Sequence, residues 1–385
     1  MKFFKVLLIT LMLLANTAFA AEFSAQVKTS EGIVQGVYDE KYNVVKWFGI
    51  PYAQQANGEK RWALPQKAEK YTGVKDCSQY APANLQFNGK NVIGQEGVLT
   101  LDVYRPDTGE NNLPVLVFIH GGNNQTSNSR LWMGEKFAKE ANAVYVSVQY
   151  RLGLLGFNNL PALANGNALK DSGNYGLIDQ AYALDWIKKN IDKFGGNANN
   201  ITVSGFSAGG RDVMAMLISP LFKDKFDKAI SFSGGLTVAD FAESQKIIAD
   251  KLAHLVVADG ICADEKDAAE WLMRDSDEVR NYLMKLSRER LAPVMAGALI
   301  RMKSFPHLYG DGKVLPKEGF AADKFNSVPL LMLASADEFT SFLNRDPYFK
   351  NRLDQVLKDK NITDEYILAN KYGSKFYGFF NGQES

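Results

Sequence analysis

Apolar residues follow two different patterns along this chain, and the pattern changes near Pro114. Before it, β-branched and aromatic residues in partial alternation predict short strands in the segments GIVQGVY (32–38), NVVKWFGI (43–50) and LTLDVY (99–104). After it, the segment VLVFI (115–119) is a continuous apolar run. Such a run is typical of a strand buried on both faces of a sheet.

Strand and helix patterns then alternate as far as residue 234. Further strands are predicted at 143–148, 201–205 and 228–233, and helices near 135–141, 177–194 and 208–218. The second helix has apolar residues at helical spacing and is closed by Gly195 and Gly196, as a C-cap would close it. The alternation indicates an α/β fold with a mostly parallel sheet covered on both faces.

The stretch from about 238 to 291 reads as charged helices without a strand pattern, and strand texture returns in SVPLLMLAS at 327–335. We interpret 238–326 as a helical excursion from the sheet. No Gly/Ser-rich linker divides the chain, so a single domain over 21–385 is the expectation.

Composition is that of a globular protein. Of the 385 residues, 46% are apolar and 23% are charged, which is ample for a large core. The net charge of +1 provides no global field to attract nucleic acid, so no nucleic-acid partner is expected. The two cysteines, Cys77 and Cys262, could form a disulfide, but free or buried thiols are the favoured interpretation.

The first 20 residues resemble a targeting segment. Lys2 and Lys5 precede a short apolar run at 6–14, and Ala18-Phe19-Ala20 has the small-x-small form of a cleavage site. The run is too short to span a bilayer, so we predict a secretory signal peptide, cleavage near Ala20, and a secreted or periplasmic protein. No later segment is long and apolar enough to span a membrane.

The segment ITVSGFSAGG (201–210) places a serine between glycines where a predicted strand meets a predicted helix. Gly205-Phe206-Ser207-Ala208-Gly209 fits the G-x-S-x-G pattern, in which a sharp turn lifts a nucleophilic serine clear of the sheet. The alternative is an ordinary glycine-rich strand–helix turn. The helix N-terminus after Ser207 favours a developing negative charge.

A second glycine pair follows the buried strand VLVFI. The segment HGG (120–122) puts Gly121 and Gly122 in the loop directly after it. Their N–H groups, together with that of Ala208, could form a three-donor oxyanion hole. The alternative is a plain loop after a strand.

With these motifs in place, the chain resembles the type-B carboxylesterases, the family of bacterial para-nitrobenzyl esterases and cholinesterases. The segments FGIPYAQ, VLVFIHGG, YRLGLLGF, GNYGLIDQAYALDWIKKNIDKFGGNANNITVSGFSAGG and LISPLFKDKFDKAISFSG carry the resemblance. It implies the α/β-hydrolase fold, and hydrolysis of small-molecule carboxylic esters through an acyl-serine, with no metal or organic cofactor. By position it makes Ser207 the nucleophile and Gly121, Gly122 and Ala208 the oxyanion hole.

The resemblance also implies an acid in the turn ASADEF, after the strand of 327–335. Glu338 takes that role, and Asp337 is the alternative if the alignment shifts by one residue. The alternative for either residue is a solvent-exposed loop carboxylate without a catalytic role. The chain departs from its relatives at Phe206, where most carry Glu, and in the family's two cysteine pairs, which it lacks.

The largest departure concerns the base. In this fold the order is Ser, then Asp or Glu, then His, yet no histidine follows Glu338. His120 belongs to the oxyanion loop, His254 lies off the apolar face of a predicted helix, and His307 precedes the acid. We therefore expect a hydrolase whose last strand, last helix and catalytic histidine are missing from this chain.

Three functional hypotheses follow. The first is a serine carboxylesterase by ancestry. The second is an inactive relic, or a non-catalytic binding protein on the same fold, although the intact serine motif argues against a binding protein. The third is a lipase or peptidase on the same fold, which a substrate panel would distinguish.

Overall fold

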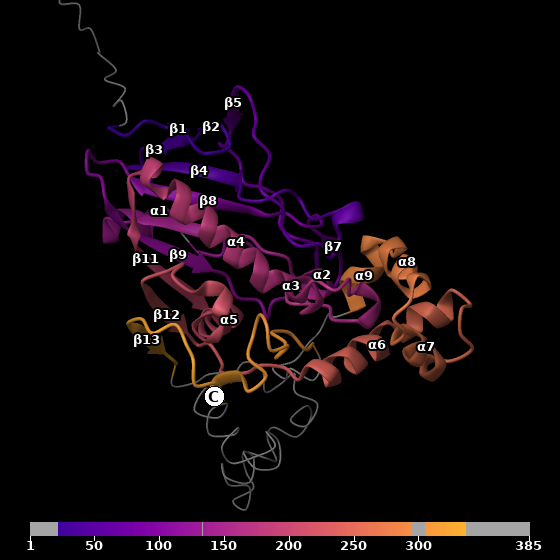
Figure 1. The fold of residues 1–385 in the computed structure, drawn as a ribbon. Coiled ribbons are helices and arrows are strands. Elements are labelled where there is room, and N and C mark those ends of the chain that lie inside the picture. Colours follow the sequence, from indigo (N-terminus) through magenta and orange to yellow (C-terminus); the bar gives the residue numbers. More distant parts are fainter. Residues whose placement is uncertain (1–21, 133, 295–304, 336–385) are drawn as a thin grey trace, which may run out of the picture.

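The computed structural model describes residues 22–132, 134–294 and 305–335, which build an eight-stranded sheet with helices on both faces (Figure 1). The strand order is β13-β12-β11-β9-β10-β8-β4-β3. These strands are β3 (Val37–Asp39), β4 (Val44–Pro51), β8 (Thr100–Pro106), β9 (Leu113–Ile119), β10 (Val144–Val148), β11 (Gly196–Phe206), β12 (Lys228–Phe232) and β13 (Leu330–Leu333).

The helices are α1 (Gly134–Ala141), α2 (Gly153–Gly156), α3 (Ala168–Asp171), α4 (Tyr175–Asn190), α5 (Ala208–Ile218), α6 (Phe241–Ala258), α7 (Glu265–Leu272), α8 (Asp277–Lys285) and α9 (Arg288–Val294). Short 3-10 turns lie at Gly58–Lys60, Pro161–Leu163, Ile191–Phe194, Pro220–Phe222 and Gly319–Ala321. The strands and helices expected between 115 and 234 are confirmed, with ends shifted by a few residues. Gly195 caps the turn after α4 at φ 77°, in the left-handed region that glycine favours.

The sheet has a parallel and an antiparallel half. β9 pairs in parallel with β10 and β11, and β12 and β13 continue the parallel order. β8, β4 and β3 complete the other half by antiparallel pairing. Val117 lies between Val146 and Val203 in the register, and all three side chains are fully buried. The continuous apolar run therefore marks a central strand, as expected.

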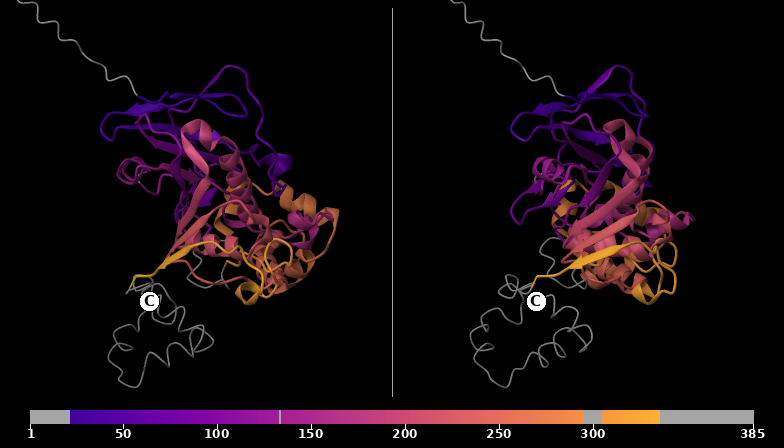
Figure 2. Two further views of the ribbon diagram at one scale, coloured as in Figure 1. Left: turned by 60° about the vertical axis from the view of Figure 1, so that its left-hand side comes forward. Right: turned by 90° about the vertical axis from the view of Figure 1, so that its left-hand side faces the viewer.

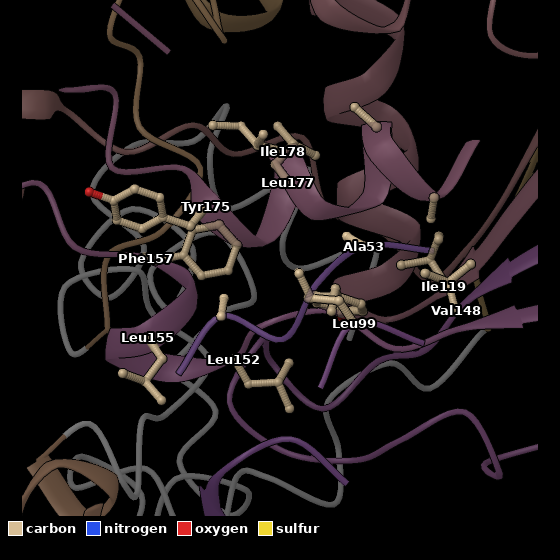
Figure 3. Close-up of a cluster of buried hydrophobic side chains, with 14 of the residues drawn as sticks. Ala53, Leu99, Ile119, Val148, Leu152, Leu155, Phe157, Tyr175, Leu177 and Ile178 are labelled. Atoms are coloured by element: carbon tan, nitrogen blue, oxygen red, sulfur yellow. The ribbon is translucent and has the colours of Figure 1, made fainter. Parts of the chain in front are cut away.

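Each face of the sheet has its own core. On one face the strands pack with α4 and α5 in a large cluster. Part of it is drawn in Figure 3, which includes Leu177 and Ile178 of α4 as well as Ile119 and Val148, the last residues of β9 and β10. On the other face a smaller cluster joins Phe118, Tyr104 and Tyr145 to Ala138 of α1. The two clusters make this a sheet covered on both faces, the architecture predicted from the sequence.

The β13 side of the sheet is exposed. All four residues of β13 are exposed by 41–52%, and among the described residues this strand is the last of the sheet, opposite the N-terminal strands (Figure 2). Phe206 and Phe232 are adjacent in the register, and Phe232 is adjacent to Leu333. These three exposed side chains share the face that α1 covers only over β4, β8 and β10. The sheet thus presents an apolar edge and face here.

The strand expected over residues 32–38 is divided in two, which the alternation of apolar residues did not predict. Gly36 splits the expected strand of 32–38 into β2 (Ile33–Gln35) and β3, which belong to different sheets. A Cβ at Gly36 would lie 2.3 Å from the Lys46 carbonyl oxygen, so the backbones can meet only at glycine. The smaller sheets are formed by β1 (Gln26–Lys28), β2 and β5 (Val74–Asp76), and by β6 (Gln86–Phe87) and β7 (Val92–Ile93).

Helices α6 to α9 gather at one end of the molecule, beside α2 (Figure 1). Within the described ranges, no helix has the length and apolar character needed to cross a bilayer. Cys77 is buried and Cys262 is partly exposed, and both are free thiols, as the sequence favoured. Residues 1–20, where the signal peptide is predicted, lie outside the described residues.

Candidate active site

Ser207 lies at the bend between β11 and α5, two elements that are labelled in Figure 1. Its φ of 57° and ψ of −120° are a costly combination for a residue with a side chain. Two hydrogen bonds hold the bend: the Ser207 N–H donates to the Phe232 carbonyl at 2.8 Å, and the Arg211 N–H donates to the Ser207 carbonyl at 2.9 Å. Ser207 itself is only half-buried. This strained, supported geometry is that of a nucleophile elbow.

The glycines around Ser207 are required by close backbone contacts. A Cβ at Gly205 would lie 2.2 Å from the Gly209 carbonyl oxygen. One at Gly209 would lie 2.0 Å from the carbonyl oxygen of Ile119, at the end of β9. Both distances are far below van der Waals contact, so only glycine lets α5 begin this close to β11 and β9.

The loop after β9 touches the elbow directly. A Cβ at Gly121 would lie 2.6 Å from the Phe206 carbonyl oxygen and 3.1 Å from Ser207 Cβ. Gly122 has φ 96°, and its carbonyl accepts hydrogen bonds from the N–H groups of Gln125 and Thr126 at 3.0 Å. The structure therefore brings the predicted glycine pair against the predicted nucleophile, across 86 positions of sequence (207 − 121).

The three expected oxyanion donors are not engaged elsewhere. Within the described part of the chain, the backbone N–H groups of Gly121, Gly122 and Ala208 have no hydrogen-bond acceptor. Ala208 is also the first residue of α5, where unpaired N–H groups and the helix dipole favour negative charge. These groups are thus available to a ligand oxygen.

Two of the three histidines are buried and engaged away from Ser207. His120 donates from Nδ1 to the Gly121 carbonyl at 2.9 Å, and its ring stacks on Tyr150. His307 Nδ1 donates to the Phe305 carbonyl at 2.9 Å, while Nε2 accepts from Arg211 Nη1 at 2.8 Å. Burial lowers the pKa of His120 to about 4. Burial and then the Arg211 charge lower the pKa of His307 to about 3.

His254 is exposed on α6, off its apolar face, as predicted. All three histidines of the chain lie within the described ranges, and none of their ring nitrogens is hydrogen-bonded to the Ser207 hydroxyl there. A histidine paired with the serine, the usual sign of an activated hydroxyl, is therefore not formed by these three residues.

The expected acid, Glu338, and its alternative, Asp337, lie outside the described residues. The strand before them, β13, is parallel to β11 and β12. Their carboxyl ends therefore share one edge of the sheet, and Ser207 follows β11 at that edge. The role of Glu338 stays a prediction.

Sequence reasoning did not find two features near the nucleophile. Trp132 lies edge-on to the ring of Phe206, with centroids 5.9 Å apart, and both side chains are exposed. Asp212, one turn into α5, is fully buried and hydrogen-bonded to Asn124 of the oxyanion loop. Neither contact has a local signal, because the partners are separated by more than 70 residues.

Comparison with known proteins matches residues 24–378 to the model of the carboxylesterase family. Liver carboxylesterase of Sus scrofa is 31% identical over 393 residues, covering 93% of this chain and 68% of the relative. Para-nitrobenzyl esterase of Bacillus subtilis (strain 168) is 30% identical over 361 residues, covering 91% and 69%. The chain spans smaller shares of other relatives, down to 57% for liver carboxylesterase 1F of Rattus norvegicus.

Solved structures of esterases are also similar to this chain. A PNB esterase matches with TM-score 0.69 at 27% identity, covering 90% of this chain and 75% of that one. The Geobacillus stearothermophilus carboxylesterase EST55 matches with TM-score 0.71 at 26% identity, covering 91% and 69%. The α/β-hydrolase fold expected from the sequence is thereby confirmed. This chain belongs to the carboxylesterase family, and by family it is a carboxylic ester hydrolase.

Proposed function

We propose that Ser207 is the nucleophile for hydrolysis of small-molecule carboxylic esters through an acyl-serine. The observation that carries the proposal is the contact between the strained Ser207 bend and the Gly121 backbone. The proposal is further supported by the backbone N–H groups of Gly121, Gly122 and Ala208, which have no acceptor among the described residues, and by the half-buried state of Ser207.

In the proposed reaction, Ser207 Oγ attacks the ester carbonyl carbon and its proton passes to a base. The carbonyl electron pair moves to oxygen, and the N–H groups of Gly121, Gly122 and Ala208 bind that oxyanion. Loss of one such donor costs about 3–4 kcal/mol of barrier in serine hydrolases. The alcohol leaves with a proton, and water then releases the acid from the acyl-serine. Glu338 is the proposed acid that orients the base, with Asp337 as its alternative.

We further propose that none of the three histidines is the base. His120 and His307 are turned to backbone carbonyls and Arg211, and His254 is on an outlying helix. Without a base, a serine hydrolase loses roughly 10⁶ in turnover, and the oxyanion hole and binding retain about 10³–10⁴ over water. The 385-residue chain is expected to show only this residual level.

Chemical rescue tests the proposal. Hydrolysis of p-nitrophenyl acetate is measured with the 385-residue chain and Ser207→Ala at increasing imidazole concentration. The expected result is slow turnover that rises with imidazole only when Ser207 is present, after subtraction of the imidazole background. Identical rates for the two proteins would refute the proposal that Ser207 is the nucleophile. Fast, Ser207-dependent turnover without imidazole would refute the proposal that none of the three histidines is the base.

The same histidine contacts favour a second candidate, an inactive relic or a non-catalytic binding protein. A fluorophosphonate probe separates the candidates, because it reports an activated serine. If labelling of Ser207 stays absent even with imidazole, the second candidate is supported. Labelling that appears with imidazole supports the esterase.

We also propose that residues 1–20 direct export to the periplasm or medium. The basic residues, the short apolar run and the Ala18-Phe19-Ala20 site support this. The mass of the exported protein should correspond to a chain that begins at Ala21. A product that retains Met1 inside the cell would contradict the proposal.

A further inference from the structure

A chain of buried polar side chains connects the nucleophile helix to the oxyanion loop. Asp212 of α5 accepts from Asn124 Nδ2 through Oδ1 at 2.8 Å, and from Gln180 Nε2 through Oδ2 at 2.7 Å. Asn124 Oδ1 lies 2.9 Å from the Tyr150 hydroxyl. All four side chains are fully buried. We call these four residues the α5–loop network.

The cost of this network indicates that it has a role. Burial of a carboxyl is unfavourable, and it raises the pKa of Asp212 to about 7 against the opposing effects of the Asn124 and Gln180 amides and of the Arg211 charge. Asn124 has φ 56°, a conformation that residues with side chains adopt at a cost. Its carbonyl accepts from the Gly153 N–H at 2.7 Å, so the strained residue is held by both its backbone and its side chain.

The network also fixes the loop peptides. The Tyr150 hydroxyl lies 2.7 Å from the His120 carbonyl oxygen, so its proton is shared between that oxygen and Asn124 Oδ1. His120 Nδ1 donates to the Gly121 carbonyl. A trans peptide is planar, with N–H opposite to C=O. Fixing these two carbonyls therefore directs the N–H groups of Gly121 and Gly122 away from Tyr150 and the His120 ring.

We propose that Asp212 and Asn124 are positioning residues, which hold the 120–127 loop against α5 so that its N–H groups keep a fixed orientation beside Ser207. The proposal rests on the proposed function, because it assigns the loop its oxyanion role. Neither residue touches the reacting atoms; both act through the loop backbone. Pre-oriented donors need no reorganisation during reaction, and a loose loop loses that advantage.

The choice of variants follows from the hydrogen bonds. Asp212→Ala and Asn124→Ala each break the connection between α5 and the loop. Asp212→Asn should preserve it, because Asn can still accept from Asn124. Gln180 Oε1 has no partner among the described residues, so a flipped Gln180 amide could accept from the new Asn nitrogen. Asn84→Ala is the matched control: Asn84 is a buried amide with two hydrogen bonds, both to the Val98 backbone.

Hydrogen exchange of the segment 118–127, followed by mass spectrometry on the full chain, tests the positioning directly. The expected result is exchange about tenfold faster in Asp212→Ala and Asn124→Ala, and unchanged in Asp212→Asn and Asn84→Ala. Equal exchange in Asp212→Ala and Asn84→Ala would overturn the proposal. If Asp212→Ala does not fold, Tyr150→Phe, which removes one hydroxyl, gives the same comparison.

Turnover supported by imidazole gives a second readout. Asp212→Ala should lower kcat about 10- to 100-fold with KM changed less than about twofold, and Asp212→Asn should restore it. A raised KM with kcat unchanged would contradict the proposal that these residues position the oxyanion donors. Failure of the proposed function is separate, since it appears as no difference between the wild type and Ser207→Ala, while the exchange result stands on its own.

Discussion

Arg211 Nη1 lies 2.8 Å from Nε2 of His307, so the nitrogen that a base would use is already accepting a hydrogen bond. The other nitrogen, Nδ1, donates to the Phe305 carbonyl. Protonation of His307 would bring a positive ring against the guanidinium in a buried site, and burial and this charge lower its pKa to about 3. His307 is thus a neutral structural residue that joins the 305–310 segment to the start of α5.

His307→Gln should therefore leave imidazole-supported hydrolysis within about twofold of the wild type, because a general base contributes 10²–10⁴-fold and His307 supplies none of it. Gln can still accept from Arg211 through its amide oxygen. Initial rates with p-nitrophenyl acetate check this, with His254→Gln as the exposed control. A fall of 100-fold or more for His307→Gln alone would show that His307 serves Ser207.

Gly121→Ala should abolish most Ser207-dependent turnover while the protein remains folded. The new Cβ would lie 2.6 Å from the Phe206 carbonyl oxygen and 3.1 Å from Ser207 Cβ, so the loop and the elbow must separate. Displacement of catalytic groups by about 1 Å can cost about 100-fold. The rate and the Tm are measured together.

The matched control is Gly109→Ala, where the nearest atom, Glu22 Oε2, would be 3.8 Å from the Cβ. It should change neither quantity. Turnover of Gly121→Ala equal to that of Gly109→Ala would mean that the loop does not need its contact with the elbow.

Asp212 should make stability decrease as the pH rises from about 4 to 7. Its folded pKa of about 7 is above the ordinary aspartate value of 3.8, so the native state holds the proton to higher pH than the unfolded chain does. The stabilisation is present at low pH, fades as the pH rises through this window, and is lost above the folded pKa. The full effect is about 4 kcal/mol for a shift of this size.

Asp212→Asn does not titrate, so its free energy of unfolding should gain on that of the wild type between pH 4 and 7. Urea denaturation of both proteins at several pH values measures the difference. His120 and His307 have lowered pKa values and act in the opposite direction, but they are present in both proteins and cancel. A difference that is constant with pH would show that Asp212 is ionised throughout.

Arg151 and Asp179 form a buried bidentate pair, with Nη2–Oδ1 at 2.7 Å and Nε–Oδ2 at 2.8 Å. Asp179→Asn should lower the free energy of unfolding by about 3–5 kcal/mol, because it leaves a guanidinium buried without its charge partner. Glu140→Gln, which breaks the exposed pair of Glu140 with Lys136, should cost less than about 1 kcal/mol. Denaturant titrations of the two variants test the contrast; similar losses would contradict it.

Local patterns predicted the parallel half of the sheet well. The apolar run of β9, the helical spacing of apolar residues in α4 and the glycine-flanked turn before α5 each depend on residues only a few positions apart. The local patterns did not predict the break at Gly36, where one alternating segment forms two strands in different sheets. The close approach of the Lys46 backbone imposes this break. The apolar segment of β13 was also predicted, but its place at the end of the described sheet and the exposure of its side chains depend on how distant segments pack.

The sequence by itself determined the alternation of strands and helices, the family, and the identity of Ser207, Gly121, Gly122 and Ala208 as candidates, since spacing and motif are written in neighbouring residues. Only the tertiary structure decided that His307 is bound to Arg211 and that Asp212 holds Asn124, pairs that are 96 and 88 residues apart. The physical reason is that a hydrogen bond acts over about 3 Å. Which distant groups come that close is fixed by how β9, β11 and α5 pack together.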